Sequence, residues 1–498
     1  MLSMEYRTKG KENKITKINY SNLGDFKFKK NGNDYLLTND YGAWIFLKPG
    51  EFNRFLAGEL DKDGKVYKEL FEKGFIKVGK KELVGLASRY LSLNHSIFRG
   101  PSLFIVVLTL RCNHRCLYCQ VTPEEKTARG FDMSKSAAKK TVDLIFRTPS
   151  DFVRIEFQGG EPLLNWPVLK YIVEYAKIVN KKKKKNLQIS MVSNITLMDD
   201  KKLKFLLDED VSVSTSFDGP AYVHDKNRVY LEGGSSHKAV IGKIKKIQKA
   251  IKAKKKKNEK EFIDDINATL TISKFSLPYS KEIINEYMKV GFNNIFLRPL
   301  SPFGLGGMIL DKIGYKAEEY IKFYQKSMDY ILKLNLKGKT FAERSSFFLL
   351  KKILKGMDPN YLEMRSPCGA GIGQMAFNYD GRIFTCDEGR MADRMGYENF
   401  KLGNVEDNDY NGLIDNETTK TMCLASSLDA HGLCSNCSYK PFCGTCPLAN
   451  FIEHGTIFPQ MSNTDRCKIN KAMFDYLFSK IKQPKYEAIF EKWLERER

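Results

Sequence analysis

Residues 103–119 read LFIVVLTLRCNHRCLYC, an apolar run that predicts a buried strand and, directly after it, the C-x3-C-x2-C triplet of Cys112, Cys116 and Cys119. Three thiolates on one short loop can hold a [4Fe-4S] cluster by three of its four irons. The fourth iron is then left without a protein ligand and is available for chemistry. The alternatives are a zinc knuckle or chance buried thiols, but zinc sites usually take four ligands in paired C-x2-C units.

The chain is strongly basic, and part of its positive charge lies in two runs of lysine. The 498 residues are enough for two or three domains, and their formal net charge is +23. Two lysine runs, at 181–185 and 254–257, follow helical patterns. Such runs suit either a nucleic-acid groove or solvated helix ends. Neither run is interleaved with arginine or aromatic residues, so we expect solvated helix ends and no nucleic-acid partner.

The cysteine content and the N-terminal residues indicate in which cellular compartment the protein lies. The chain has 11 cysteines, and its first 20 residues are polar and charged, unlike a signal peptide. No apolar run approaches the roughly 18 residues that a membrane span needs. We therefore expect a cytoplasmic protein with no membrane partner, whose cysteines are metal ligands rather than disulfides.

Residues 1–98 are predicted to form a separate N-terminal module. Extended segments flank Asn31-Gly32-Asn33, which is a hairpin signal, and residues 41–47 add an extended or helical piece. Amphipathic helices at 51–59 and 66–73 and a strand at 75–78 follow. This winged-helix-like order resembles the PqqD-like recognition domains of ribosomally made, modified peptides, which bind a leader peptide as an added edge strand. The alternative is an N-terminal cap on the next domain.

Residues 99–310 alternate between strands and helices. Strands are predicted at 103–110, 152–158, 187–193, 211–217, 263–272 and 294–298, with helices at 134–147, 166–180, 199–208, 237–253 and 280–290. This α/β alternation predicts a parallel sheet with active-site residues at the C-terminal strand ends. Residues 311–366 form a helical linker, with two amphipathic helices in 317–356. Residues 367–498 are expected to be a metal-organised domain that does not continue the sheet.

The triplet, with Tyr118 before its third cysteine, resembles that of the radical S-adenosylmethionine (radical SAM) superfamily. The resemblance implies a partial (β/α)6 barrel in which the open iron chelates SAM. Reductive cleavage of SAM then yields a 5′-deoxyadenosyl radical that abstracts hydrogen from a substrate. The sequence also carries motifs that resemble the SAM contacts of the family, and the residues assigned to them, beside Tyr118, are Gly159, Gly160, Glu161, Asn194, Ser216, Asp218 and Arg228.

Within that set, Gly159, Gly160 and Glu161 match the motif for the SAM amino group, and Arg228 matches the arginine that pairs with SAM. The positions at 194, 216 and 218 match those that line the ribose. His224 and Arg298 are further candidates, for which a local hydrogen bond and a structural ion pair are the alternatives.

Eight cysteines follow residue 367. Their number matches two four-thiolate clusters, although two C-x2-C pairs could also form a zinc ribbon. The pattern resembles the SPASM domain of radical SAM peptide maturases, which holds two auxiliary [4Fe-4S] clusters. The resemblance assigns an outer cluster to Cys434, Cys437, Cys443 and Cys467, and an inner cluster to Cys368, Cys386 and Cys446. Cys423 either completes the inner cluster or leaves one of its irons open for substrate.

Asp387 directly follows Cys386. In related sulfatase maturases, an Asp beside the inner cluster's cysteine serves as a general base, so the resemblance implies that Asp387 takes a substrate proton. The alternative is a solvated carboxylate.

Further stretches, including GAWIFL at 42–47 and GIGQMAFN at 371–378, resemble the His-Xaa-Ser system radical SAM maturases of the HxsB type. This resemblance implies a peptide substrate with His-Xaa-Ser repeats and a partner maturase. We therefore predict an enzyme that crosslinks or oxidises a ribosomally made peptide and is reduced by a donor such as flavodoxin or ferredoxin. The alternatives are an RNA-modifying radical SAM enzyme, sulfatase-maturase-like oxidation of a protein side chain, and a non-catalytic iron-sulfur scaffold.

Overall fold

One mixed sheet organises the centre of the computed structural model, which describes residues 18–257, 265–360, 364–407 and 409–495. Its strand order is β14-β12-β10-β9-β8-β4-β16-β17-β18. The strands from β14 to β4 run parallel to their neighbours, as predicted. They are β4 (Leu103–Thr109), β8 (Phe152–Gly159), β9 (Asn186–Val192), β10 (Val211–Ser216), β12 (Asn267–Thr271) and β14 (Leu297–Arg298).

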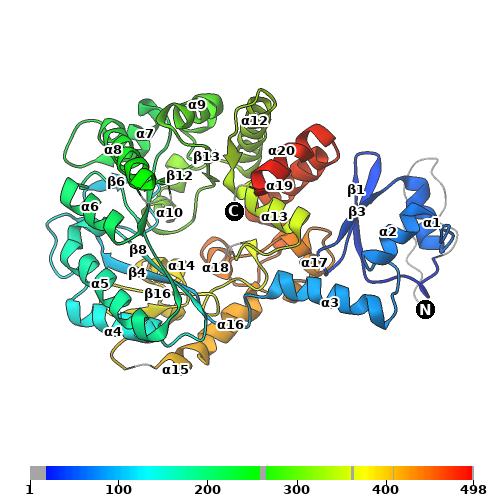
Figure 1. Ribbon diagram of the computed structural model, residues 1–498, viewed down its shortest axis with the longest axis horizontal. Coiled ribbons are helices and arrows are strands. Elements are labelled where there is room, and N and C mark those ends of the chain that lie inside the picture. The colour runs from blue at the N-terminus through cyan, green and yellow to red at the C-terminus, as the bar shows by residue number, and fades with distance from the viewer. Residues whose placement is uncertain (1–17, 258–264, 361–363, 408, 496–498) are drawn as a thin grey trace.

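Helices cover the outer face of these parallel strands (Figure 1). Phe104 and Val106 of β4 belong to the core beneath the helices. Ile105 and Val107 pack with Phe384 on the other face of the same strand. Because both faces are covered, β4 is a continuous apolar run. The crossover helices, all close to their predicted positions, are α4 (Lys135–Ile145), α5 (Trp166–Lys183), α6 (Asp200–Asp208), α8 (Ser236–Lys257) and α9 (Ser280–Val290).

The last two predicted strands of the barrel are shorter in the structure. β12 begins at Asn267, and residues 263–264 of the predicted strand lie outside the described residues. The segment 294–298 is divided into β13 (Asn294–Ile295) and β14. β13 pairs with β15 (Ala342–Glu343), whereas β14 pairs with β12. The chain thus leaves the barrel sheet gradually as it enters the helical linker.

The C-terminal cysteine-rich region continues the barrel sheet, contrary to the expectation of a domain apart from it. β16 (Gln374–Phe377) pairs in parallel with β4, and all four of its residues are buried. β17 (Arg382–Phe384) and β18 (Lys401–Asn404) extend the sheet in antiparallel order. β16 thereby hydrogen-bonds the edge of β4 that would otherwise present unpaired backbone groups.

The N-terminal module has the predicted hairpin and helices. β1 (Lys27–Asn31), β2 (Asp34–Thr38) and β3 (Trp44–Leu47) form an antiparallel sheet, followed by α1 (Pro49–Ala57) and α2 (Lys65–Glu72). The module has its own apolar core. Residues 75–78 do not form the predicted strand, and Ile76 makes only an isolated bridge to Leu23.

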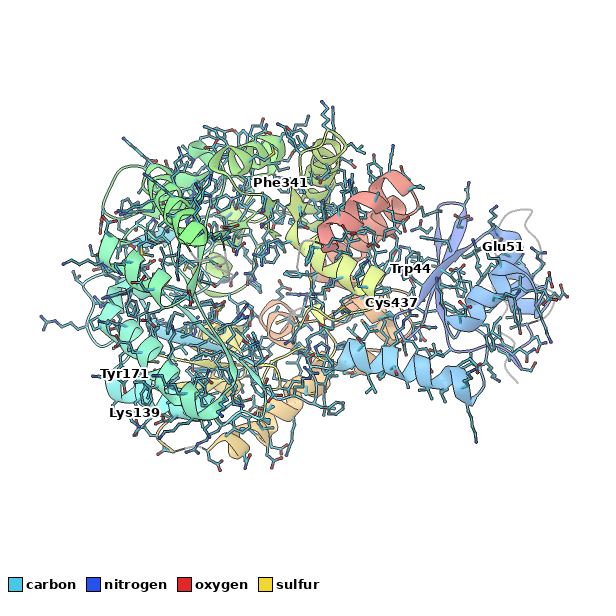
Figure 2. All side chains as sticks on the ribbon, viewed as in Figure 1. Trp44, Glu51, Lys139, Tyr171, Phe341 and Cys437 are labelled. Carbon is cyan, nitrogen blue, oxygen red and sulfur yellow. The ribbon has the colours of Figure 1, made fainter. Side chains whose placement is uncertain are left out.

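The module is joined to the rest of the chain by a helix and by packing. α3 (Lys80–Asn94), for which the sequence carried no prediction, runs from the module toward the barrel (Figure 1). Trp44 donates from Nε1 to the Ile353 carbonyl oxygen over 2.8 Å, and its ring lies edge-on to that of Phe478. Figure 2 shows Trp44 on the side of the module that faces Cys437.

The C-terminal helices that receive the module complete the fold. They include α12 (Ala317–Leu336) and α13 (Arg344–Lys355), which are the two helices predicted within 317–356, and also α19 (Asp465–Ile481) and α20 (Pro484–Glu495). Among the described helices, none combines the length and the apolar character that a membrane crossing needs.

Candidate active site

The three thiols of the triplet lie on a loop that two short ladders hold in place. Cys112 ends β5 (Arg111–Cys112), which pairs with β7 (Glu124–Glu125). Cys116 ends β6 (His114–Cys116), which pairs with β11 (Arg228–Tyr230). Cys112 and Cys116 are each 9% exposed, and Cys119 is half-buried. Burial raises the pKa of Cys116 to about 12, so a bound metal is what would turn such a thiol into a thiolate.

The surroundings of the triplet suit cluster ligands. Hydrogen bonds to the sulfurs of an iron-sulfur cluster tune its properties. The backbone N–H of His114 donates to Cys112 Sγ over 3.4 Å, a contact of the kind that tunes cluster ligands. The triplet therefore fits the cluster that the sequence predicts.

The two glycines after β8 bring that strand against the cysteine loop. The N–H of Gly160 donates to the Thr109 carbonyl over 2.8 Å, and the N–H of Glu161 donates to the Arg111 carbonyl over 2.8 Å. A Cβ on Gly160 would lie 2.2 Å from the Arg111 carbonyl oxygen, and Gly159 has a φ of +118°. Only glycine permits this approach and this backbone conformation. The two glycines therefore set the position of the triplet on the sheet.

Glu161 joins the ends of two strands through its buried carboxylate. The carboxylate accepts hydrogen bonds from Ser193 Oγ at 2.7 Å, from the Asn194 N–H at 2.8 Å and from the Leu163 N–H at 3.1 Å. Burial raises the pKa of Glu161, and these donors oppose the rise. Glu161 thus positions the end of β8 against the end of β9. Its contact with the SAM ammonium group stays a prediction.

Tyr118, Asp218 and Arg228 form a buried polar chain beside the triplet. The Tyr118 hydroxyl donates to Asp218 Oδ2 over 2.7 Å, and Arg228 Nη1 donates to the same hydroxyl over 2.9 Å. Burial raises the pKa of Asp218 to about 6, although the charge of Arg228 and the Tyr118 hydrogen bond lower it. Arg228 Nε is buried without a hydrogen-bond partner in the described part of the chain. One charged donor therefore remains for a ligand carboxylate, which fits SAM.

The other predicted SAM residues lie at the same edge of the sheet. Asn194 Nδ2 donates to Asn113 Oδ1 over 2.8 Å and lies 3.9 Å from Cys112 Sγ. Ser216 ends β10 and Arg298 ends β14, on either side of β12. The guanidinium carbon of Arg298 lies 5.5 Å from the centre of the Phe296 ring. The C-terminal strand ends thus gather the residues as the parallel topology predicts.

Ser236 connects two buried histidines, a role that no sequence motif indicated. Its Oγ lies 3.0 Å from His114 Nε2 and 3.1 Å from His224 Nε2. Burial lowers the pKa of His114 to about 3 and holds that of His224 well below its usual value. Both rings are therefore neutral at pH 7. His224 thus makes local hydrogen bonds, to the Asp218 N–H and to Ser236. Such bonds were the alternative to its being part of the SAM site.

The three cysteines predicted for the inner cluster are packed in one buried group with Met422 of α16 (Glu417–Ser426). They are Cys368, Cys386 and Cys446. Cys423, also on α16, is half-buried. Ser426 links it to Cys368, because the Ser426 Oγ donates to the Cys423 carbonyl over 3.1 Å and accepts from the Cys368 N–H over 3.0 Å. Cys423 is thus near the inner group.

The four cysteines predicted for the outer cluster line one cavity: Cys434, Cys437, Cys443 and Cys467. The N–H of Tyr439 donates to Cys437 Sγ over 3.5 Å, and Asn470 Nδ2 donates to Cys443 Sγ over 3.5 Å. Arg466 and Lys471 line the same cavity, so cations lie beside the thiols. These features suit a thiolate cluster.

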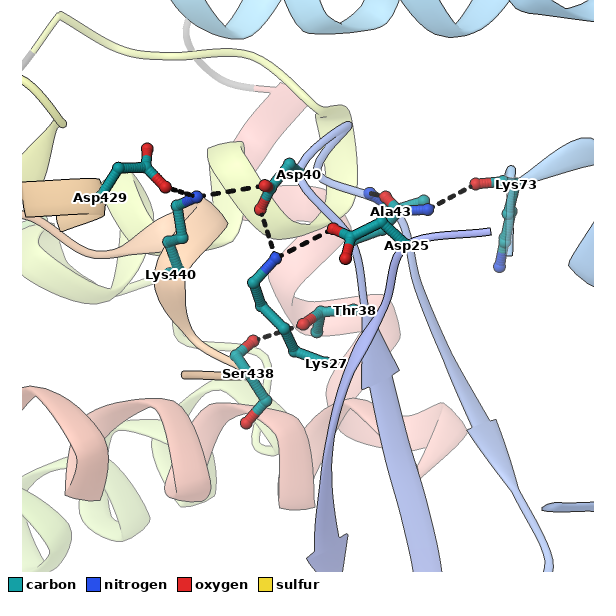
Figure 3. A network of polar contacts seen from close by, with 10 residues as sticks. Asp25, Lys27, Thr38, Asp40, Ala43, Lys73, Asp429, Ser438 and Lys440 are labelled. Atoms are coloured by element: carbon teal, nitrogen blue, oxygen red, sulfur yellow. Dashed lines mark hydrogen bonds and ion pairs between the residues drawn. The ribbon is translucent and has the colours of Figure 1, made fainter. Parts of the chain in front are cut away.

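The loop between Cys437 and Cys443 also binds the N-terminal module (Figure 3). Lys440 Nζ pairs with Asp40 at 3.1 Å and with Asp429, and Asp40 also pairs with Lys27 at 2.8 Å. Thr38 Oγ1 donates to the Ser438 carbonyl over 2.7 Å. The module is thus bonded directly to the loop that carries two of the predicted outer ligands.

Asp387 is the first residue of α14 (Asp387–Arg394), directly after Cys386. Its Oδ1 accepts from Arg390 Nε at 2.9 Å and from Arg390 Nη2 at 2.7 Å. Asp387 is 7% exposed and Arg390 0%. The carboxylate is therefore a buried partner of an arginine rather than a solvated group. Its role as a base stays a prediction.

Comparison with known proteins agrees with this geometry. The model of the Radical SAM superfamily matches residues 106–258. The chain is 24% identical over 390 residues to the cysteine-type anaerobic sulfatase-maturating enzyme of Clostridium novyi, covering 77% of this chain and 96% of the relative. It is also 24% identical over 440 residues to the radical SAM cyclopropyl synthase TigE of Paramaledivibacter caminithermalis, covering 85% and 82%.

Two solved structures share the fold. Native anSMEcpe with bound AdoMet superposes with a TM-score of 0.63 at 20% identity, covering 78% of this chain and 99% of that one. Streptococcus suis SuiB bound to precursor peptide SuiA superposes with a TM-score of 0.53 at 13% identity, covering 90% and 99%.

A partial barrel with three thiols after its first strand defines a class of iron-sulfur enzymes that cleave SAM. The chain has the α/β fold of radical SAM enzymes, and its residues 106–258 match the model of that superfamily; its cysteine-rich C-terminal region fits a SPASM domain. It is an enzyme, and the match of residues 106–258 supports SAM and one [4Fe-4S] cluster as cofactors. An anaerobic sulfatase-maturating enzyme and a radical SAM cyclopropyl synthase are among its relatives.

Proposed function

We propose that this radical SAM enzyme modifies a ribosomally made peptide and carries two auxiliary [4Fe-4S] clusters in addition to the SAM cluster. The grouping of the C-terminal cysteines carries the proposal. Four of them surround one cavity, and three others are packed together beside the start of α14. α14 also contacts the triplet side of the barrel, since Arg394 Nη2 donates to Glu124 Oε1 over 2.6 Å. The contact between α14 and the triplet side of the barrel supports an inner auxiliary cluster close to the barrel.

The protein's own groups have distinct roles in this proposal. When bound at the triplet, SAM and its cluster supply the radical that abstracts a substrate hydrogen. Glu161 and the chain of Tyr118, Asp218 and Arg228 hold the loop in position and keep water from it. Asp387, oriented by Arg390, takes a proton from the substrate. An external donor such as flavodoxin or ferredoxin supplies electrons.

We propose domain boundaries at 1–98, 99–310, 311–366 and 367–498, with the last region continuing the barrel sheet through β16. In the module, β1 and β3 are the edge strands of a three-stranded sheet. An edge strand can add a peptide through main-chain hydrogen bonds, which supports a leader-peptide role. Because the sequence resembles the HxsB-type maturases, we also propose a substrate with His-Xaa-Ser repeats and a partner maturase.

Co-expression tests the proposal. The enzyme is produced together with candidate small peptides from genes beside its own, and each peptide is analysed by tandem mass spectrometry. We expect the loss of two hydrogens per modified site. A variant with Cys112, Cys116 and Cys119 changed to Ala is the control and should leave the peptide unmodified. An enzyme that forms 5′-deoxyadenosine but leaves the peptide mass unchanged would contradict the peptide assignment.

Oxidation of a single protein side chain, as in sulfatase maturation, is the second candidate. The position of Asp387 beside Cys386 favours it, as do the clostridial relatives. A crosslink would suppress fragmentation between the joined residues in tandem mass spectra, whereas side-chain oxidation would leave the fragment ladder complete. The same spectra therefore separate the two chemistries.

We also propose that Cys423 is the fourth ligand of the inner cluster. Its link to Cys368 through Ser426 supports this assignment. Cys423→Ala should then change the Mössbauer spectrum and lower the iron content, whereas a variant at an ordinary half-buried position such as Thr418→Ala should not. An unchanged spectrum in Cys423→Ala would instead favour an open iron at the inner cluster.

A further inference from the structure

Two backbone N–H groups fix the direction of the hydrogen bonds around Ser236. One belongs to Asp218, shortly after the end of β10, and it donates to His224 Nδ1 over 3.2 Å. The other belongs to Thr196, beyond the end of β9, and it donates to Asn194 Oδ1 over 3.0 Å. A backbone N–H can only donate, so neither bond can reverse. Each bond therefore anchors a chain of side chains whose donors and acceptors can be assigned in turn.

The chain from Asp218 reaches Ser236 through His224. Burial lowers the pKa of His224 well below its usual value, so the ring is neutral. A neutral imidazole that accepts at Nδ1 carries its single N–H on the other ring nitrogen. His224 Nε2 therefore donates to Ser236 Oγ, which lies 3.1 Å away. On this side the serine hydroxyl is the acceptor.

The chain from Thr196 reaches Ser236 from the opposite side. Because Asn194 Oδ1 accepts from Thr196, the amide nitrogen of Asn194 faces Asn113 Oδ1 at 2.8 Å. Asn113 Oδ1 is then also the acceptor for His114 Nδ1, which lies 3.3 Å away. With its one proton on Nδ1, the neutral His114 ring accepts at Nε2 from Ser236 Oγ over 3.0 Å. On this side the serine hydroxyl is the donor.

The two chains thus meet on a group that must accept on one side and donate on the other. A serine hydroxyl has one O–H donor and two acceptor lone pairs, so it satisfies both demands at once. Ser236 is the first residue of α8 and is buried. Without its hydroxyl, one ring would keep a buried N–H without an acceptor, and the other a buried nitrogen without a donor. The hydroxyl therefore holds both rings in one tautomer.

The chain from Thr196 also contacts the first thiol of the triplet. Asn194 Nδ2 lies 3.9 Å from Cys112 Sγ, and the backbone N–H of His114 donates to the same sulfur over 3.4 Å. Hydrogen bonds to the sulfurs of an iron-sulfur cluster set its reduction potential, and contacts of this kind orient the ligands. A change at Ser236 can therefore reach this sulfur through His114.

We propose that Ser236 is a positioning residue of the SAM site, whose hydroxyl joins the two chains and holds His114 and the Asn194 amide in one orientation at Cys112. The alternative is that the serine only stabilises the start of α8. Ser235 already does so, because its Oγ accepts from the Lys238 N–H over 3.1 Å. The inference concerns how the SAM site is held, so it goes beyond the proposed function and does not depend on the substrate.

The test compares Ser236→Ala with wild type as full-length, cluster-loaded enzyme. Equilibrium dialysis with labelled SAM measures SAM affinity, which should fall about 3- to 10-fold, the range for losing one hydrogen bond between neutral groups. A redox titration followed by electron paramagnetic resonance gives the reduction potential of the cluster whose signal SAM perturbs. This potential should become more negative, because a less well aligned N–H stabilises the reduced cluster less.

Ser346→Ala in α13 is the matched control. Ser346 is also buried, and its Oγ also joins two side chains, lying 2.7 Å from Tyr324 Oη and 2.7 Å from Glu343 Oε2. This variant loses a comparable hydroxyl but should keep the SAM affinity and the reduction potential of wild type. An unchanged potential in Ser236→Ala, or an equal shift in both variants, would overturn the proposal.

A second measurement needs no cluster. Urea unfolding of the cluster-free protein is compared for wild type, Ser236→Ala, Asn113→Ala and the double variant. Since His114 joins Ser236 to Asn113, the second mutation should destabilise less once the first has released the ring. Simple additivity of the two effects would also contradict the proposal. Neither measurement uses a peptide, so failure of the peptide assignment leaves both results standing.

Discussion

Asp218 and Arg228 place opposite charges beside the cysteine triplet, with the Tyr118 hydroxyl between them. Water barely reaches them, because Asp218 is 0% and Arg228 5% exposed. Burial disfavours the ionised carboxyl, and the arginine favours it. The net result is a pKa of about 6. Asp218 is therefore mostly, but not completely, ionised at pH 7.

This shift predicts a pH dependence of stability. A carboxyl whose pKa is raised on folding binds more protons in the folded state, so the free energy of unfolding falls as pH rises between the two pKa values. For Asp218 the window runs from 3.8 to about 6. About 3 kcal/mol is lost across it. Urea unfolding of cluster-free wild type and Asp218→Asn below and above this window measures the effect. A stability difference between the two proteins that is equal on both sides of the window would contradict the shift.

The proposed base makes a second prediction at this scale. Asp387→Asn keeps an oxygen that accepts from Arg390 but cannot take a proton. Product yield per 5′-deoxyadenosine should fall about 10²- to 10⁴-fold, the usual contribution of a general base. Mass spectrometry of the peptide and chromatography of 5′-deoxyadenosine measure the two quantities. Asp393→Asn, which removes a carboxylate elsewhere on α14, is the control, and a full yield in Asp387→Asn would exclude the base.

At the scale of elements, the cysteine loop depends on its neighbours on the sheet. β8 approaches it through Gly159 and Gly160, and β11 pairs with the strand that carries Cys116. Glu161 then ties β8 to the end of β9. The thiols are thus positioned by contacts from several strands of the barrel. These contacts hold the cysteine loop in place although it is not itself a long strand or helix.

Gly160→Ala tests this positioning. The added Cβ would lie 2.2 Å from the Arg111 carbonyl oxygen and 2.6 Å from that of Leu110, both of which are backbone atoms. Stability should fall by about 1–3 kcal/mol, as in overpacked sites, and the iron content of the SAM cluster should fall with it. Gly242→Ala in α8 is the matched control, since nothing lies within 4 Å of its Cβ position. It should be neutral or stabilising, and equal iron content in both variants would contradict the argument.

At the scale of the whole molecule, the module and the outer-cluster region are one connected unit. Asp40 lies between Lys27 of the module and Lys440 of the ligand loop (Figure 3). Burial raises the pKa of Asp40, but the two lysines outweigh it and hold the pKa below its usual value. A peptide bound to the module would therefore be held at a fixed distance from the outer thiols.

A double-mutant cycle measures this connection. Asp40→Asn and Lys440→Met should each destabilise the protein, and the coupling between them should be about 1 kcal/mol, at the upper end for partly exposed pairs. Urea unfolding of the four proteins gives the value. Lys468→Met with Asp465→Asn, an exposed pair within α19, is the comparison cycle. Coupling near zero for Asp40 and Lys440 would show that other contacts hold the module.

Much of the barrel and of its site could be predicted from the chain. Each crossover helix lies within a few residues of its predicted range, because apolar spacing and caps are local signals. Ser134 and Asp199, for example, cap α4 and α6. The cysteine triplet and the glycine pair were visible because covalent spacing limits what such residues can bind.

Other features depend on contacts between distant parts of the chain. The pairing of β16 with β4 joins residues about 270 positions apart, and it leaves no mark in local periodicity. The same is true of Ser236 between two histidines and of Thr38 on the loop after Cys437. Arg390 Nη1, which is buried without a hydrogen-bond partner among the described residues, is also such a feature, since an unsatisfied N–H exists only where packing excludes water.

The linear order of residues thus established the chemistry available to this protein: an open three-thiol loop, eight further thiols and a repeating strand-helix pattern. Folding established which groups meet. It merged the cysteine-rich region with the barrel sheet, bonded the module to the outer ligand loop and buried Arg390 with one N–H that has no partner among the described residues. The physical reason is that ligand spacing and helical periodicity are encoded over a few residues, whereas burial and pairing depend on the whole packed molecule.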